Sequence, residues 1–95
     1  SGPREICADG LGAVWIVDGA RTLRRLNAEG ILDSFGVDAN TPADQAPAGL
    51  SETPLRFLSH EIGALACDSA GFAYFADRRS ESIVRVSASG MARRI

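Results

Sequence analysis

The sequence predicts an all-β protein made of two copies of one four-stranded antiparallel unit. Three observations predict it: a stretch that returns at a fixed spacing, short apolar strands, and tight turns at the same place in both copies. The stretch DGLGAVWIVD at residues 9–18 returns as DSAGFAYFAD at residues 68–77. Similarity at a fixed period is typical of repeat architectures.

The similarity continues beyond this stretch after a single inserted residue. LRRLNAEG at 23–30 then corresponds to IVRVSASG at 83–90. Matches in the same order on both sides of one insertion indicate one structural unit used twice. The repeated positions are Asp9, Gly12, Trp15, Asp18 and Arg25 in the first copy and Asp68, Gly71, Tyr74, Asp77 and Arg85 in the second.

Each copy divides into four short strands joined by turns of hairpin length. The first strands are REICA at 4–8 and ALAC at 64–67, and the third strands are TLRRLN at 22–27 and SIVRVS at 82–87. The fourth strands are ILDSF at 31–35 and MARRI at 91–95. A four-stranded antiparallel meander is the blade of a β-propeller, so we expect one blade at 3–35 and a second at 64–95.

The second strand of each copy, AVWIV at 13–17 and FAYFA at 72–76, is apolar on both faces. Such a strand is typical of a central position between two other layers. The turn before it reads Asp-x-x-Gly, at 9–12 and at 68–71. Asp at the first position of a type I turn accepts a local backbone hydrogen bond, and Gly suits the fourth position. We therefore interpret the repeated aspartates as structural residues and not as a paired-carboxylate site.

The 28 residues at 36–63 form an inter-blade segment, rich in Pro, Ala, Asp and Gly in its first half. Thr53 as N-cap and Pro54 at the first helical position predict a short helix over LRFLSHEI. Phe57 and Leu58 are expected to pack this segment against a blade. Because loops on rigid scaffolds usually carry recognition, specificity is expected here.

The pattern PREICADGLGAVWIVD followed by LRRLNAEG resembles the NHL repeat and the related blades of streptogramin lyase-like and gluconolactonase-type propellers. Glu5 and Ala64 depart from it, because Gly is common at their place. The resemblance implies a six-bladed type of propeller with a binding role. Gluconolactonase-type enzymes hold a divalent cation in the central channel with a Glu near the start of a first strand, which implies a ligand role for Glu5.

Composition excludes several classes of protein. Apolar residues make up 45% of the 95 residues and charged residues 23%, which is typical of a folded globular domain. The net charge of -2 argues against nucleic acid as a partner, because phosphate neutralisation needs clustered basic residues. No apolar run approaches the roughly 20 residues of a membrane span. The compartment stays open, and an extracytoplasmic one is expected if a signal segment has been removed.

Two cysteines, Cys7 and Cys67, lie in corresponding strands but one residue out of register with each other. Because successive strand residues point to opposite faces, we expect the thiols to face different ways and to remain free and buried. Two cysteines alone make neither a disulfide framework nor a metal site.

No catalytic residue, metal site or cofactor is predicted. No Ser or Cys stands in a nucleophile context such as G-x-S-x-G, and the lone histidine, His60, has only Glu61 beside it. Glu5, His60 and Glu61 are the candidate ligand-binding residues. Arg25 and Arg85 are hypothesised to hydrogen-bond the repeated aspartates.

Two blades do not close a propeller, which typically has about four to eight blades. Either the chain is part of a longer one, or identical copies close the ring, three copies giving six blades. The leading function is a non-catalytic module that binds a protein, peptide or glycan. The alternative is part of a metal-dependent lactonase or a streptogramin lyase-like enzyme whose site other blades complete.

Overall fold

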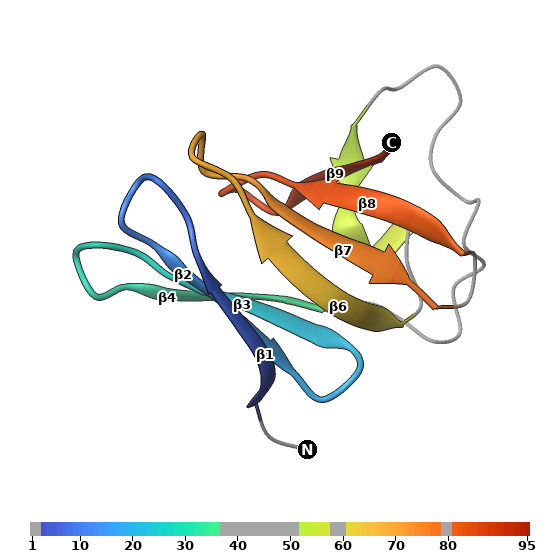
Figure 1. Ribbon diagram of the computed structural model, residues 1–95, viewed down its shortest axis with the longest axis horizontal. Coiled ribbons are helices and arrows are strands. Elements are labelled where there is room, and N and C mark those ends of the chain that lie inside the picture. Colours follow the sequence, from blue (N-terminus) through green and yellow to red (C-terminus); the bar gives the residue numbers. More distant parts are fainter. Residues whose placement is uncertain (1–2, 37–51, 58–60, 79–80) are drawn as a thin grey trace.

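The computed structural model describes residues 3–36, 52–57, 61–78 and 81–95, which form two antiparallel sheets (Figure 1). The first sheet has the order β1 (Pro3–Ala8), β2 (Val14–Asp18), β3 (Thr22–Leu26), β4 (Leu32–Gly36). The second has the order β5 (Thr53–Pro54), β9 (Met91–Arg94), β8 (Ser82–Val86), β7 (Ala73–Asp77), β6 (Ile62–Cys67). The all-β meanders predicted from the repeat are confirmed.

The turns that enter the two central strands have the same conformation. The Asp9 N–H donates to the Ala13 carbonyl at 2.9 Å, and the Asp68 N–H donates to the Phe72 carbonyl at 3.0 Å. Gly12 and Gly71 have φ angles of 88° and 97°, a region that favours glycine. The repeated glycines are thus explained by the backbone of this turn.

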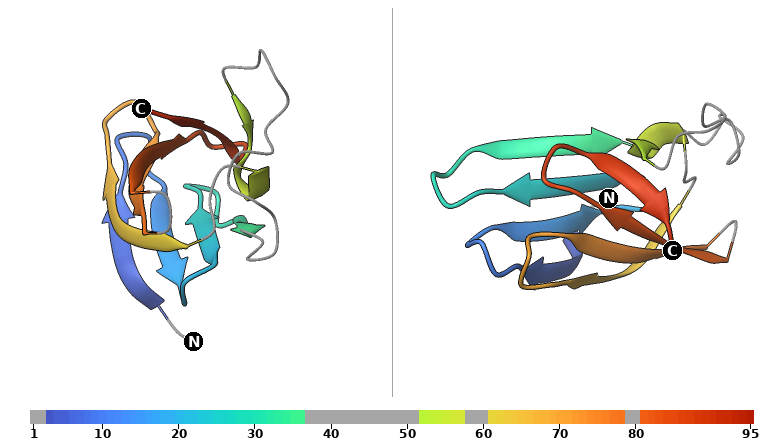
Figure 2. Two further views of the ribbon diagram at one scale, coloured as in Figure 1. Left: turned by 90° about the vertical axis from the view of Figure 1, so that its right-hand side faces the viewer. Right: turned by 90° about the horizontal axis from the view of Figure 1, so that it is seen from above.

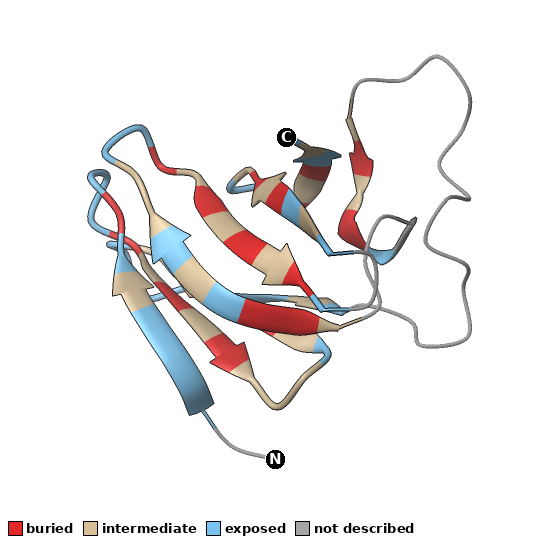
Figure 3. Ribbon diagram, turned by 45° about the vertical axis from the view of Figure 1, so that its right-hand side comes forward, coloured by how far each residue is buried: buried red, intermediate tan, exposed pale blue. Residues whose placement is uncertain are grey.

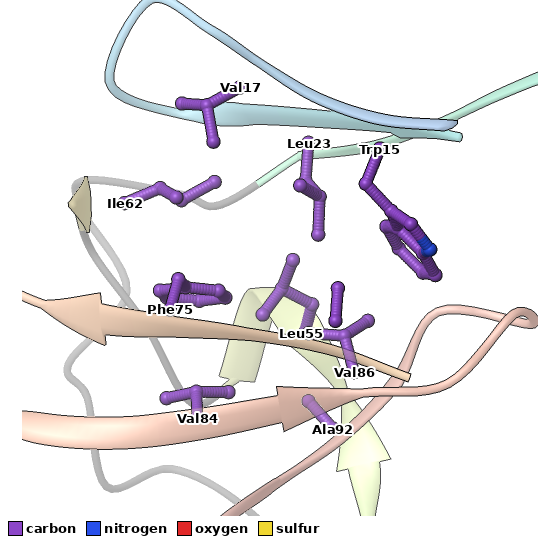
Figure 4. Packing of buried hydrophobic residues seen from close by; sticks show 10 residues of the cluster. Trp15, Val17, Leu23, Leu55, Ile62, Phe75, Val84, Val86 and Ala92 are labelled. Carbon is purple, nitrogen blue, oxygen red and sulfur yellow. The ribbon is translucent and has the colours of Figure 1, made fainter. Parts of the chain in front are cut away.

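The hydrophobic core lies between the two sheets, which face each other as stacked layers (Figure 2). Figure 4 shows Trp15, Val17 and Leu23 of the first sheet pointing toward Phe75, Val86 and their neighbours in the second. The first strands, β1 and β6, contact each other directly, and at the other end of the sheets a 3-10 helix, η1 (Leu55–Phe57), contacts both β4 and β9.

Only one side of each central strand is buried, which differs from the burial on both faces expected from the sequence. Trp15 and Val17 are fully buried, whereas Val14 and Ile16 are half-buried (Figure 3). β7 shows the same alternation, with Phe75 buried and Tyr74 half-buried. Among the described residues, the second sheet covers one side of the first, and no further layer covers the outer sides.

The segment at Thr53–Pro54 forms the short strand β5, and the predicted N-cap at Thr53 is wrong. Thr53 pairs with Ala92 and Pro54 with Met91, so β5 adds a fifth strand to the second sheet. Proline is tolerated at such an edge because its missing N–H is not needed by the ladder. Leu55–Phe57 then turn as η1, and residues 58–60 lie outside the described part of the chain.

Of the described residues 52–57, Leu55 packs into the core, with 2% of its surface exposed. Phe57 and Leu58 were expected to do so, but the Phe57 side chain and residue 58 lie outside the described part of the chain.

No helix among the described residues is long and apolar enough to cross a bilayer.

Cys7 and Cys67 form a disulfide, so the expectation of two free thiols is wrong. Their Cα atoms are 5.8 Å apart, within the range that a disulfide spans. The one-residue offset between the two repeats is present, but it has the opposite consequence. Neighbouring sheets meet through opposite faces, so two residues that point to opposite faces of the repeated unit point toward each other across the interface.

Candidate functional site

The carboxylate of Asp9 organises the turn before β2. Its Oδ1 accepts hydrogen bonds from the backbone N–H groups of Leu11 at 2.9 Å and Ala13 at 3.1 Å. Its Oδ2 accepts one from the indole N–H of Trp15 at 2.9 Å. A short Asx turn is thereby tied to the largest side chain of the core.

Asp68 repeats this arrangement at the corresponding turn. Its Oδ1 accepts from the N–H groups of Ala70 at 2.9 Å and Phe72 at 3.0 Å, and its Oδ2 accepts from the Tyr74 hydroxyl at 2.7 Å. Both oxygens of each carboxylate are therefore engaged in building a turn and fixing the aromatic residue six positions later.

These contacts change the proton affinity of the groups involved. Burial acts to raise the pKa of Asp9, but the bonds from Trp15, Leu11 and Ala13 and the nearby positive charge of Arg25 outweigh it and lower the pKa. The hydrogen bonds from the Phe72 N–H and then the Tyr74 hydroxyl lower the pKa of Asp68. The same bond to Asp68 raises the pKa of Tyr74.

The two repeated arginines have different partners. A guanidinium nitrogen of Arg25 lies 4.0 Å from Asp9 Oδ2, and the group lies 5.7 Å from the centre of the Trp15 ring. Arg85 instead lies 4.4 Å above the Phe72 ring, and its ion pair, at 3.7 Å, is with Glu52 of the inter-blade segment.

The second pair of repeated aspartates also differs between the sheets. Asp18 forms an ion pair with Arg24 at 3.0 Å on the outer side of the first sheet. Asp77 is buried, and its Oδ1 accepts a hydrogen bond from the Glu61 backbone N–H at 3.4 Å.

Two of the three predicted ligand-binding residues, Glu5 and Glu61, lie within the described part of the chain and have different neighbours. The Glu5 carboxylate accepts a hydrogen bond from the Leu65 N–H at 3.4 Å, whereas Glu61 lies before β6 and its carbonyl accepts from the Arg78 N–H at 3.1 Å. His60 lies outside the described residues. Among the side chains that the structure describes, no three His, Cys, Asp or Glu residues gather closely enough to hold a metal ion.

Two hollows in the structure are candidate sites for a ligand. A hollow of about 400 Å³ follows β1 and is lined by Pro3, Arg4, Glu5 and Ile6. A larger one, of about 590 Å³, contains none of the predicted residues. Three separate segments line it: residues 34–36 of β4, residues 54–56, and the turn at 89–91. We call it the β4 hollow. The only sequence signal for it was the expectation that the inter-blade segment carries recognition.

Comparison with known proteins supports the architecture. No family model and no curated protein matches the chain. Among solved structures, the chain is similar to the crystal structure of virginiamycin B lyase from Staphylococcus aureus, with a TM-score of 0.62 and 20% sequence identity over 98% of this chain. The chain spans 26% of the length of that structure. This likeness shows the fold alone: the two sheets are blades of a β-propeller, and a closed ring needs further blades.

Proposed function

We propose that the protein is a non-catalytic β-propeller module of the NHL type that binds a protein, peptide or glycan, and that the β4 hollow is its binding site. The observation that carries this proposal is that the repeated carboxylates are already hydrogen-bonded within the protein, whereas the β4 hollow is open. Asp9 and Asp68 use both oxygens within their turns, whereas the β4 hollow is open to solvent between three chain segments.

The size and the chemistry of the β4 hollow support a ligand of this kind. Its volume of about 590 Å³ lies within the range of about 300–1,000 Å³ for ligand pockets. Phe35 and Met91 supply apolar surface, and Arg56, an exposed residue, supplies a positive charge. β4 also ends the order of its sheet, so an extended peptide could pair with its outer edge.

Binding should be tested with the protein immobilised against peptide and glycan arrays, followed by titration of the strongest ligand. Arg56→Ala is expected to weaken binding by about five-fold or more, which corresponds to about 1 kcal/mol. Arg4→Ala is the matched control, because Arg4 is also exposed but lies on β1, at the opposite edge of the sheet from β4. Equal weakening by both substitutions, or an array without a ligand, would contradict the proposal.

A second candidate is part of a metal-dependent lactonase or a streptogramin lyase-like enzyme, with its site completed by other blades. Two observations favour it: Glu5 is exposed beside the hollow along β1, and the similar solved structure is a virginiamycin B lyase. Calorimetric titration with Ca²⁺, Mg²⁺ and Zn²⁺, followed by incubation with virginiamycin B, tests it. Saturable metal binding that Glu5→Gln abolishes would favour the enzyme, and no saturable binding by the assembled protein would eliminate it.

The disulfide leads us to propose that the protein matures in an oxidising compartment. Disulfides between structural cysteines persist in such compartments and are rare in the cytosol. Alkylation of the protein as it is isolated from its native cells should leave Cys7 and Cys67 unmodified unless a reductant is added first. Two alkylated thiols without reductant would contradict this assignment.

A further inference from the structure

The side of each sheet that faces away from the other sheet carries a group of apolar residues beside an arginine, which is Arg24, ion-paired with Asp18, in the first sheet and Arg85 in the second. We call the outer side of the first sheet the Ile16 face; it carries Ile6, Val14, Ile16, Leu26 and Leu32, which are matched across the sheet by the strand register. We call the outer side of the second sheet the Tyr74 face; it carries Ala64, Ala66, Tyr74, Ala76 and Ile83.

The Tyr74 face is the repeat counterpart of the buried side of the first sheet. Tyr74 corresponds to Trp15, Ala76 to Val17 and Ile83 to Leu23. The three counterparts in the first sheet are 0% exposed because the second sheet covers them, whereas Ile83 is 46% exposed.

The Ile16 face is, in the same way, the counterpart of the buried side of the second sheet. Ile16 corresponds to Phe75 and Leu26 to Val86, both of which are buried against the first sheet. Ile6 corresponds to Leu65, which packs against the core. One molecule therefore carries both sides of its own interface a second time, without a partner for either among the described residues.

One outer face has a hollow, and the other has an exposed side chain that projects from it. The Tyr74 face contains a hollow of about 230 Å³ among its small side chains, Ala64, Ala66 and Ala76. Ile6 projects from the Ile16 face and is 70% exposed. In the interface between the two sheets, the backbone N–H of Leu65 donates a hydrogen bond to the Glu5 carboxylate. Leu65 is the counterpart of Ile6, and Glu5 is the counterpart of Ala64. The repeat thus directs Ile6 of one molecule toward the alanine-lined hollow of another.

We propose that the Tyr74 face binds the Ile16 face of a second copy of this chain, in the same arrangement as the two sheets within one copy. The contact joins unlike faces, so it generates a ring if the rotation between copies closes. A ring of about four to eight blades needs about two to four copies. This assembly is independent of ligand binding in the β4 hollow, which one copy lines by itself.

Cysteine cross-linking between two copies tests the register of this contact. Ala66 is the counterpart of Cys7, and Ala8 is the counterpart of Cys67. If the arrangement is repeated, Ala66→Cys in one copy and Ala8→Cys in another will bring two cysteines to the Cα separation of 5.8 Å seen within the chain. An affinity-tagged Ala8→Cys variant is therefore mixed with untagged Ala66→Cys and oxidised.

The mixture is expected to give a cross-linked species that contains both variants, and each variant alone should give none. The same amount of cross-link from a single variant, or no cross-link in the mixture, overturns the proposal. Mixing tagged Ala8→Cys with Ser89→Cys is the matched control, because Ser89 is exposed but lies in the turn between β8 and β9, whereas Ala66 lies on β6 at the other side of the sheet.

Light scattering after size-exclusion chromatography of the unmodified chain is a second test that needs no cysteine variant. The proposal expects a mass of about 20–40 kDa, from about two to four chains. Ile6→Glu should shift it to that of one chain, 10.0 kDa. Ile31→Glu should not, although Ile31 is 58% exposed, because it lies in the turn before β4. If the unmodified protein has the mass of one chain, the proposal is overturned. This holds regardless of whether other blades or another protein cover the two faces.

Discussion

At the scale of single residues, the effect of replacing a repeated aspartate depends on the side-chain donor that its carboxylate accepts from. Asp9 and Asp68 accept the same two backbone bonds, but the third donor is an indole N–H in one case and a phenol O–H in the other. An indole N–H can only donate, whereas a hydroxyl group both donates and accepts. The same carboxylate should therefore be replaceable by an amide in one turn and not in the other.

We predict that Asp9→Asn destabilises the protein by about 1–3 kcal/mol, because a buried donor then loses its acceptor. If the amide oxygen of Asn accepts from the backbone N–H groups of the turn, the amide NH₂ group faces the Trp15 N–H, and two donors oppose each other. If the amide oxygen accepts from Trp15 instead, the N–H groups of the turn lose their acceptor. Asp68→Asn should cost less than about 1 kcal/mol, because the Tyr74 hydroxyl can reverse and accept from the amide. Urea unfolding of both variants measures the difference, and equal losses would contradict this account.

The lowered pKa values predict how stability falls in acid. A carboxyl group whose pKa is lower in the folded protein contributes stability that is complete above its unfolded pKa, about 3.9, and is lost as the pH falls through the folded value. Asp9 and Asp68 are such groups, so the loss should occur below about pH 4.

Asp68→Asn removes one of these groups while keeping the turn. Its free energy of unfolding should therefore decrease less steeply in acid than that of the unmodified protein, as urea midpoints over this pH range would measure. The contribution of Asp68 is refuted if the two profiles are parallel.

At the scale of elements, the two Asp-x-x-Gly turns are joined to each other as well as to their own strands. The Gly10 N–H donates to the Asp68 carbonyl at 3.0 Å, and a Cβ atom at residue 10 would collide with the Ser69 backbone. The sequence predicted both turns but not this contact, because nothing local to either turn indicates that they adjoin.

We predict that Gly10→Ala lowers the free energy of unfolding by about 1–3 kcal/mol, because the two turns must separate to admit the added methyl group. Ser69→Ala changes the other side of the same contact without adding bulk to the backbone, and it should stay within about 0.5 kcal/mol of the unmodified protein. Thermal unfolding of the two variants would compare them. A neutral Gly10→Ala would show that the turns do not press together.

The strand β5 shows a second limit at this scale. Thr53 and Pro54 have the local conformational preferences of a helix N-terminus. Pairing of Thr53 with Ala92 and burial of Leu55 decided otherwise. Local capping preferences are worth about 1 kcal/mol, less than burial of a leucine side chain at about 1.5–3 kcal/mol.

At the scale of the whole molecule, the disulfide fastens the first strands of the two sheets across a sequence separation of 60 residues. Closing a loop of that length removes much of the conformational entropy of the unfolded chain. We predict that Cys7→Ala/Cys67→Ala lowers the free energy of unfolding by about 4 kcal/mol.

Dithiothreitol should destabilise the unmodified protein to the level of this double variant and leave the variant itself unchanged. Denaturant unfolding with and without reductant makes the comparison. A double variant as stable as the oxidised protein would rule out a stabilising role for the disulfide.

The sequence by itself determined the unit: the repeat, the strands, the turns and the residues that share a face all follow from backbone preferences and from alternation along a strand. Only the tertiary structure decided how two units meet, and therefore the disulfide, the fifth strand and the β4 hollow. The repeat shows which face of its own sheet each residue lies on, but neighbouring sheets contact each other through opposite faces. For that reason Cys7 and Cys67, whose register offset predicts that they face different ways, form a disulfide across the interface between the two sheets.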